Sequence, residues 1–268
     1  MFGHTFYNGT IRRYVTLFGT LFNDITINRP DTSHNQIHSV KVPVVYGPKE
    51  KMLARLTSDP ELNRKTSVQL PIISFEMTDI QYDGSRKLNT IGKRYKKDDT
   101  DPNKMYYQYN PVPYNINFSL SVLVKNTDDG TRIIEQILPF FTPEWTATIN
   151  LIPDMDINMD IPVILNDVRL TDTYEGNFEE RRTLEWNLTF TLKGYLFGPI
   201  RKSGIIKFAN SSIFNSLSSN TELSSVVVTP GLLSNGSPTT NSSLTISRDL
   251  IYPDDDFGYI VRYEDPTT

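Results

Sequence analysis

Two segments of the 268-residue chain alternate apolar and polar side chains over more than ten positions, and this alternation constrains the fold more than any other feature. The first segment is Asn115–Lys125 and the second is Leu184–Phe197. Every second side chain along a strand points to the same face, so each segment predicts a long strand with one buried and one solvated face. Strands of this kind are typical of an antiparallel sheet.

The spacing of the other apolar residues predicts three helices and four further strands. Apolar residues recur every three or four positions in Gly9–Phe22, after Pro48, and in Arg132–Phe141, where Asp128–Gly130 is expected to form the preceding turn. The further strands are expected at residues 24–28, 40–46, 68–79 and 161–170. We therefore predict an α+β fold, in which helices pack on one face of a largely antiparallel sheet.

The composition changes near residue 208, and this change predicts a core domain at residues 1–207 and an extension at residues 208–268. Asn210–Asn220 and Ser234–Ser243 consist mostly of small polar residues. They are predicted to be linkers or loops, because they bury too little apolar surface to offset their ordering entropy. An aromatic and acidic island follows at residues 244–263. We expect it to order either against the core of its own chain or against a neighbouring subunit.

Charge is distributed unevenly along the chain. Residues 1–110 hold 16 Lys and Arg against 11 Asp and Glu, whereas the remaining residues hold 11 against 20. This asymmetry suits a chain that is complementary to its own neighbour or to two partners, although chance surface charge gives the same pattern. The chain has no cysteine and no apolar run long enough for a membrane span, so a soluble protein made in a cytoplasm is expected.

Residues and motifs that carry chemistry are scarce. The sequence has no nucleotide-binding glycine loop, nucleophile elbow or zinc-protease motif. Its histidines are His4, His34 and His38. The last two have the spacing of a metal pair on a helix, but their polar neighbours favour a loop with two exposed side chains. We expect no catalytic residue, no cofactor and no metal, and we predict that the chain is not an enzyme.

A basic segment at residues 86–97 contains Arg94, Lys96 and Lys97 beside Tyr95. Basic residues interleaved with aromatic ones are typical of nucleic-acid binding. The carboxylates that follow at residues 98–101 would repel phosphates, however. The segment therefore favours a solvated loop or a charged protein contact, and no direct nucleic-acid binding is expected.

Several short segments occur in a fixed order between residue 1 and about residue 200. They are Met1-Phe2-Gly3, Phe6-Tyr7-Asn8, Arg12-Arg13-Tyr14, Thr16-Leu17-x-Gly19-x-Leu21-Phe22, Val42-Pro43-x-x-Tyr46-x-x-Lys49-Glu50, Leu70-Pro71-x-Ile73, Gln108-Tyr109-Asn110-Pro111-x-Pro113, Ile134-Glu135-Gln136-Ile137-Leu138-Pro139-x-Phe141-x-Pro143, Arg181-Arg182-x-x-Glu185-Trp186-x-Leu188-Thr189-Phe190 and Gly194-Tyr195. Together they resemble the proximal tail sheath stabiliser family of T-even-type contractile phages. No such match is seen beyond about residue 205.

The resemblance implies a tail-terminator-like subunit that forms a homohexameric ring in the virion and is assembled in the host cytoplasm. The ring would cap the neck-proximal end of the tail sheath and tube and join the tail to the neck. The implied partners are further copies of the chain, the tail sheath protein, the tail tube or tube terminator protein, and neck proteins, with no membrane. The alternatives are the tube terminator or another neck ring protein and, more remotely, a carbohydrate-active tail enzyme that uses Glu76 or Glu144.

A ring needs two different patches that meet between neighbours. Candidate contact residues come from the first helix, the basic segment and the aromatic island. They are Arg12, Arg13, Tyr14, Arg94, Lys96, Lys97, Arg181, Arg182, Tyr252, Phe257, Tyr259 and Tyr263. The resemblance also implies a sheath whose subunits exchange extended arms that add to sheets. We therefore expect Leu244–Tyr263, or an edge strand of the core, to make the join to the sheath.

Overall fold

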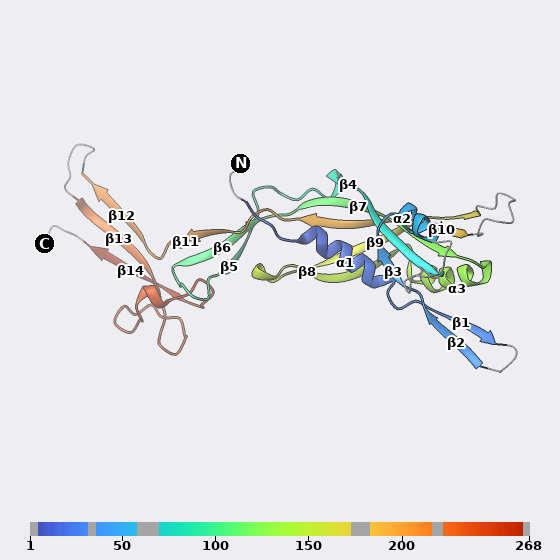
Figure 1. The fold of residues 1–268 in the computed structure, drawn as a ribbon. Helices are drawn as coiled ribbons and strands as arrows, with labels where there is room; N and C mark the ends of the chain where they lie inside the picture. The colour runs from blue at the N-terminus through green and yellow to red at the C-terminus, as the bar shows by residue number, and fades with distance from the viewer. Residues whose placement is uncertain (1–4, 32–35, 58–69, 173–182, 216–221, 265–268) are drawn as a thin grey trace. The chain divides into compact units, whose positions relative to one another are not determined.

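The computed structural model describes residues 5–31, 36–57, 70–172, 183–215 and 222–264. The chain divides into two compact units, whose elements are labelled in Figure 1. The first unit contains residues 1–89 and 111–197, and the second contains residues 90–110 and 198–268. This division differs from the single boundary that the composition predicts after residue 207.

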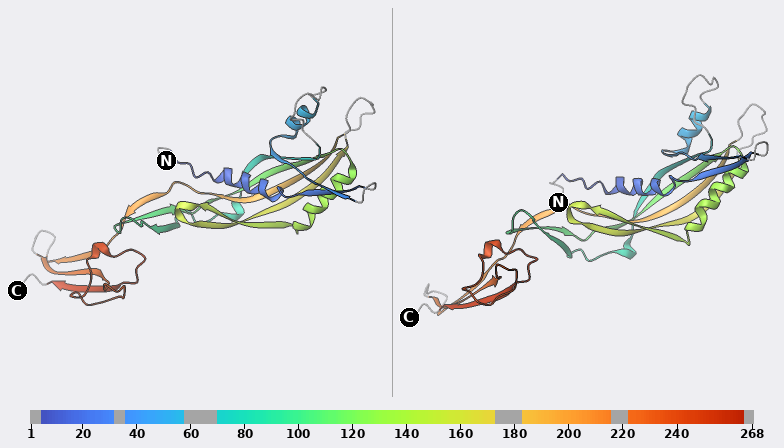
Figure 2. Two further views of the ribbon diagram at one scale, coloured as in Figure 1. Left: turned by 60° about the horizontal axis from the view of Figure 1, so that its bottom comes forward. Right: turned by 90° about the horizontal axis from the view of Figure 1, so that it is seen from below.

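The first unit is built on a six-stranded sheet (Figures 1 and 2). In spatial order its strands are β3 (Val44–Tyr46), β4 (Ile72–Tyr82), β7 (Val112–Val124), β10 (Leu184–Leu196), β9 (Ile157–Asp172) and β8 (Glu144–Ile152). Only β3 runs parallel to its neighbour, and the other pairs are antiparallel. The two long alternating segments are β7 and β10, which pair along their whole length at the centre of the sheet. The predicted α+β fold with a largely antiparallel sheet is confirmed.

Burial along β7 explains where the helices pack. At its start the apolar side chains of Ile116, Phe118 and Leu120 are buried, and the polar ones between them are half-buried. Beyond Leu120 every side chain of β7 is buried. There helix α2 (Lys49–Thr57) covers the second face of the sheet, because its Met52 packs against Ile72 of β4 and Leu123 of β7. Helices therefore lie on both faces of the sheet, not on one face as predicted.

Helix α1 (Thr10–Leu21) packs on the first face through aromatic rings. Phe18 is fully buried, and its ring stacks on Phe118 with centroids 4.3 Å apart and 7° between the ring planes. The Phe75 ring lies 5.5 Å away. Gly19 permits this approach, because a Cβ at that position would lie 2.8 Å from the Phe75 ring. The helix predicted over residues 9–22 is thus confirmed.

Tyr14 fastens the same helix to the sheet. Its side chain is fully buried, and burial raises its pKa above the ordinary value. The hydroxyl donates to the Tyr195 carbonyl and accepts from the Tyr195 N–H, both at 2.8 Å. A Cβ at Gly194 would lie 2.9 Å from the Tyr14 ring. Tyr14, Gly194 and Tyr195 all belong to the segments that carry the resemblance, so the structure explains them as packing residues.

A two-stranded hairpin, β1 (Thr26–Asp31) and β2 (Gln36–Lys41), lies beside helix α3 (Thr127–Ile137). Arg29 of the hairpin donates two hydrogen bonds to Asp129 of the helix, at 3.1 and 2.6 Å. Asp129 is only 4% exposed, so its charge depends on this pairing. The hairpin is therefore anchored to the helix through a half-buried ion pair.

The start of α3 corrects one sequence expectation. Asp128–Gly130 was predicted to be the turn before the helix, but it lies in the first helical turn. Acidic side chains are favourable there because they face the positive end of the helix dipole. The helix ends at Ile137, and a short 3₁₀ turn follows at Leu138–Phe140.

The second unit contains two three-stranded antiparallel sheets. In spatial order the first consists of β11 (Arg201–Gly204), β6 (Lys104–Tyr109) and β5 (Lys93–Lys97). The second consists of β12 (Ala209–Phe214), β13 (Glu222–Gly231) and β14 (Gly258–Glu264).

Two expectations for this unit need correction. Asn210–Asn220 was predicted to be a linker or loop, but its first residues belong to β12, which pairs with β13. The basic segment was predicted to be a solvated loop or a charged protein contact, and its residues Lys93–Lys97 form a strand that pairs with β6 and not a loop. The pairing of β6 with β11 also joins residues 90–110 to the chain after Gly198, which explains why the second unit begins before residue 207.

Candidate partner-binding surfaces

One face of the β12–β13–β14 sheet is apolar and open to solvent. The register places Val226 beside Tyr263, Val228 beside Val261 and Pro230 beside Tyr259 on this face. We call it the tyrosine face; its residues are Ile213, Val226, Val228, Pro230, Tyr259, Val261 and Tyr263. Tyr263 is 75% exposed and Tyr259 is 64% exposed. A contiguous exposed apolar patch of this kind is typical of a protein interface.

The opposite face of the same sheet is covered by the chain's own loop. Ile260 and Leu232 are buried there, and the Thr239 N–H donates to the Gly231 carbonyl at 3.1 Å. Gly231 and Gly258 permit this contact, because a Cβ at either position would lie within 2.7 Å of the Thr239 carbonyl oxygen. The loop predicted at residues 234–243 therefore has a structural role, and it leaves the tyrosine face uncovered.

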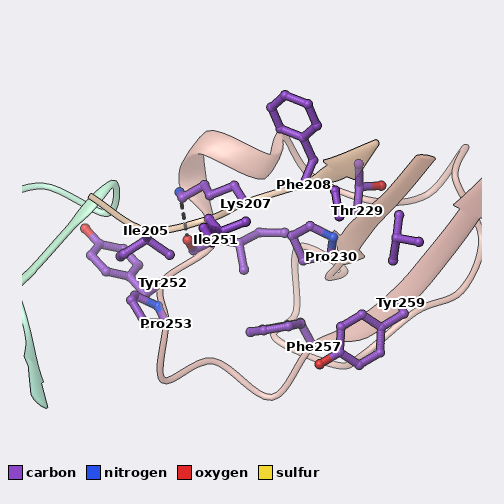
Figure 3. A pocket seen from close by; sticks show the side chains of 13 residues that line it. Ile205, Lys207, Phe208, Thr229, Pro230, Ile251, Tyr252, Pro253, Phe257 and Tyr259 are labelled. Carbon is purple, nitrogen blue, oxygen red and sulfur yellow. Dashed lines mark hydrogen bonds between the residues drawn. The ribbon is translucent and has the colours of Figure 1, made fainter. Parts of the chain in front are cut away.

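A hollow of about 250 Å³ continues the tyrosine face at one end (Figure 3). Its lining is mostly apolar and includes Ile205, Phe208, Pro230, Ile251, Pro253, Phe257 and Tyr259. The rings of Phe257 and Tyr259 meet edge to face, with centroids 5.8 Å apart. With so few polar groups in its wall, the hollow suits an apolar side chain of a partner better than a charged ligand.

Lys207 holds one wall of this hollow in place. Its ammonium group donates to the carbonyls of Arg248, Asp249 and Ile251 at 2.9, 3.1 and 3.0 Å (the bond to Ile251 is drawn in Figure 3). Burial lowers the pKa of Lys207 below its usual value. The lysine thus supplies the donors that three loop carbonyls need.

The structure brings two of the predicted clusters together, the basic segment and the aromatic island. Lys97 of β5 forms a 2.7 Å ion pair with Asp254 and lies 5.7 Å from the ring centroid of Tyr252. The hydrogen bond that Lys97 donates to Asp254 raises the pKa of Lys97 and lowers the pKa of Asp254. These residues are far apart in the sequence, and the pairing makes them one surface of the second unit.

Two of the three carboxylates after the basic segment, Asp98 and Asp101, are engaged within the second unit. Asp98 is buried, accepts from the Thr100 hydroxyl and N–H, and pairs with Lys202 at 3.2 Å. These donors hold the pKa of Asp98 well below its usual value. Asp101 pairs with Lys104 at 2.6 Å. Lys93 and Arg94, by contrast, have no carboxylate partner among the described residues, and Lys93 lies over the rings of Tyr107 and Tyr109.

The other predicted contact residues are placed differently. Arg12 is exposed on α1, and Arg13 donates to the Leu151 carbonyl of β8. Tyr14 was expected at an interface, but the core of its own unit encloses its side chain completely. Arg181 and Arg182 lie outside the described residues.

Sequence reasoning missed most of the exposed apolar surface. Ile206, Ile213, Phe214 and Leu250 are each at least half exposed. Ile213 and Phe214 are adjacent apolar residues inside the Ser/Asn-rich segment, and this was their one signal in the sequence. Ile206 and Leu250 lie outside that segment and gave no such signal. Exposed apolar side chains of this kind are expected on a surface completed by another molecule.

The carboxylates considered for catalysis do not form a pair. Glu76 lies on β4 and Glu144 on β8, and three strands separate them. At ~4.8 Å per strand, the separation is about 19 Å, whereas glycoside hydrolysis needs about 5–10 Å. Glu185 is buried in a 2.7 Å ion pair with Lys49. Within the described ranges, no His, Asp and Glu side chains cluster closely enough to hold a metal ion, and no helix is long and apolar enough to cross a membrane.

Comparison with known proteins gives a reason for the exposed apolar and basic surfaces of this chain. Residues 5–250 match the model of the T4-like virus Myoviridae tail sheath stabiliser. The chain belongs to this tail sheath stabiliser family. It is 31% identical over 207 residues to the tail completion protein gp15 of Enterobacteria phage T4, an alignment that covers 75% of this chain and 74% of the relative. The resemblance seen in the sequence is confirmed, and the family match extends beyond residue 205 through β12 and β13.

Membership in the family establishes a structural role in a contractile phage tail. It also gives the tyrosine face and the basic strand a context, because a structural tail protein acts through contacts with other chains. The segments that carried the resemblance in the first unit, by contrast, include the residues that pack α1 against its sheet.

Proposed function

We propose that this chain forms a homohexameric ring at the neck-proximal end of the tail. The ring caps the sheath and the tube and joins the tail to the neck. Its partners are further copies of the chain, the sheath protein, the tube or tube terminator protein, and neck proteins. The role is mechanical, with no catalytic step, and the protein is assembled in the host cytoplasm and resides in the virion.

One observation supports this proposal beyond family membership. Of the 23 large hydrophobic side chains exposed among the described residues, 13 belong to the second unit, which contributes about a third of the chain. A surface this apolar is costly in an isolated chain and is stabilised by a lasting partner. We therefore assign the sheath contact to the tyrosine face and to the free edge of β14, where a partner strand would find unpaired backbone groups.

The experiment removes the second sheet and keeps the first. A chain truncated after Lys207 loses β12, β13 and β14 but retains β11 and its pairing with β6. It is supplied to phage that lack the native protein, and the tails are examined by electron microscopy. With the truncated chain we expect tails whose sheath is uncapped and detaches. With the full-length chain we expect capping to be restored. Capped, attached sheaths on tails with the truncated chain would contradict the sheath contact.

The ring itself is tested by mass. The chain has a mass of 30.7 kDa as a monomer. Native mass spectrometry of the purified protein, or of the protein on isolated tail ends, is expected to give six times this mass. In phage without the protein, over-long tubes under an intact sheath would point instead to a tube terminator.

A further inference from the structure

The first unit ends in a long free strand edge. β8 is the outermost strand of the six-stranded sheet and has nine residues, and among the described residues it pairs only with β9. Free edges of this length are usually protected by lysine, proline or a bulge, because they offer unpaired backbone groups to another chain. Glu144–Asn150 contains no lysine and no proline. The one irregularity, a bulge, comes after Asn150.

The surroundings of this edge shape what can bind there. Trp145, Ala147 and Ile149 are half-buried on one face of β8, and the residues between them are exposed on the other. A hollow of about 670 Å³ lies between Ile149 and the outer face of α1, including Tyr7 and Leu17. A strand added to β8 would therefore have side chains against α1 on one face and solvent on the other.

Charge restricts the identity of that strand. Residues 133–168, which include β8 and most of β9, contain six Asp and Glu and no Lys, Arg or His. Glu144 lies on the edge itself, and Asp160 of β9 accepts from the Thr148 hydroxyl at 2.5 Å. Arg12 and Arg13 approach the edge only at its end, near Ile149 and Leu151. The one charged side chain of β8 is thus acidic, a second carboxylate lies beside it on β9, and the edge favours a basic strand.

The chain itself carries such a strand on its second unit. β5 is the outermost strand of the β11–β6–β5 sheet, and its five residues are Lys93, Arg94, Tyr95, Lys96 and Lys97. Lys97, at the end of the strand, is already paired with Asp254 of its own unit. Basic side chains fall on both of its faces, whereas a nucleic acid lying on the sheet would contact only one. Lysines on an edge prevent pairing with most strands, but they favour pairing with an acidic one.

We propose that the free edge of β8 in one copy of the chain pairs with the free edge of β5 in the next copy. The two edges are different and of opposite charge, so the contact is heterologous and repeats from copy to copy, as a closed ring requires. This inference rests on the ring of the proposed function and specifies the strands that join it.

The absence of cysteine from the chain provides a clean test. Thr146→Cys places a single thiol on the exposed face of β8, and Tyr95→Cys places one on β5; both parent side chains are exposed. Phage lacking the native protein are complemented with an equal mixture of the two variants, each with a different affinity tag. The tails are treated with a short bismaleimide. We expect a cross-linked pair that carries both tags, and none from either variant alone.

The other outcomes decide against the inference in distinguishable ways. A cross-link with Thr146→Cys alone would show that β8 meets β8, and capped tails without a mixed cross-link would show that the edges lie apart. Either result overturns the edge pairing but leaves the capping function intact. Tails that incorporate the full-length chain as a monomer would overturn both. A cross-link from β8 to the sheath protein would assign this edge to another partner.

Charge reversal checks the electrostatic part. Arg94→Glu in the β5 variant is expected to lower the mixed cross-link about 2- to 5-fold, and Glu144→Arg in the β8 variant to restore it. Arg201→Glu on β11, an exposed position on the opposite edge strand of the same sheet, is the matched control and should leave the yield unchanged. If Arg94→Glu has no effect, or if Glu144→Arg does not rescue it, the charge argument fails and the basic residues of β5 serve only to protect an edge.

Discussion

In the first unit, phenylalanines from α1, β4, β7 and β10 meet in one buried cluster, whereas the aromatic residues of β14 in the second unit face solvent. Both units are built mostly from antiparallel strands with alternating side chains. The difference lies in what covers the sheet. Helices cover both faces in the first unit, but in the second a polar loop covers only one face of the β12–β13–β14 sheet.

This comparison separates two uses of the same kind of residue. A phenylalanine in the first unit stabilises the fold, because it leaves water when the chain folds. A tyrosine on β14 remains exposed after folding, so most of its surface is still available for burial against a partner. Substitutions should therefore change folding in the first unit and assembly in the second.

The largest expected effect comes from Phe18→Ala. The ring is fully buried and contacts those of Phe118, Phe75 and Phe190, so its removal leaves a cavity that the neighbouring strands cannot close. We expect the free energy of unfolding to fall by ~3–5 kcal/mol. Urea titration followed by far-ultraviolet circular dichroism, which reports on the strands of both units, measures it. Leu250→Ala, at a 61% exposed site in the second unit, is the control, and an equal loss there would contradict the comparison.

A smaller effect is expected from Tyr14→Phe. The substitution keeps the ring but removes the hydroxyl that satisfies both the N–H and the carbonyl of Tyr195. Leaving buried polar groups unpaired costs about 1–3 kcal/mol. The same urea titration should detect it. Tyr7→Phe, at an 81% exposed position before the helix, should leave the titration unchanged. A loss below about 0.5 kcal/mol for Tyr14→Phe would mean that the hydroxyl contributes little to fastening α1.

In the second unit, acid should act through Asp98. Its pKa is lower in the folded chain than the usual 3.8, so its stabilising contribution is fully present above about pH 4 and is lost as the pH falls through the folded value. Asp98→Asn should therefore be less stable than wild type at pH 7, with a difference that shrinks as the pH is lowered below 4. Parallel urea titrations at pH 7 and below pH 4 measure both parts.

Asp99→Asn, one position away and exposed, serves as the control and should leave the free energy of unfolding at pH 7 unchanged. If Asp98→Asn differs from wild type by the same amount at every pH, the hydrogen bonds of Asp98 contribute without a change in its protonation.

The sequence predicted the parts of the fold that depend on local pattern. β7, β10 and α1 have a long period of two or a clear spacing of three and four, and each lies within a few residues of its expected place. β12 could not be predicted, because a Ser/Asn-rich strand has little β-propensity of its own and forms through its pairing with β13. β8 was not predicted, although Trp145, Ala147 and Ile149 alternate with polar side chains in the sequence.

The partner surfaces show the same limit. The exposed tyrosines and the basic segment were visible in the sequence, and they were named as contact residues. The ion pair between Lys97 and Asp254 was not visible in the sequence, because the two residues meet only when the loop before β14 folds back to β5. The prediction that Tyr14 lies at an interface was wrong for a related reason. A tyrosine beside two arginines is expected to be exposed, and its burial follows only from the sheet against which it packs.

The smallest effect on folding, and the sharpest test of the comparison, is expected from replacing Tyr259 and Tyr263 with serine. Both side chains are largely exposed, so the change in the free energy of unfolding should stay within about 0.5 kcal/mol. Tails assembled with the double variant should nevertheless show uncapped sheaths by electron microscopy, because the apolar surface offered to the partner is gone. Tyr46→Ser together with Tyr82→Ser, at 55% and 52% exposed positions of the first unit, is the matched control and should leave capping intact. If both pairs behave alike, exposure on the tyrosine face has no special role, and the contact with the sheath must lie elsewhere on the chain.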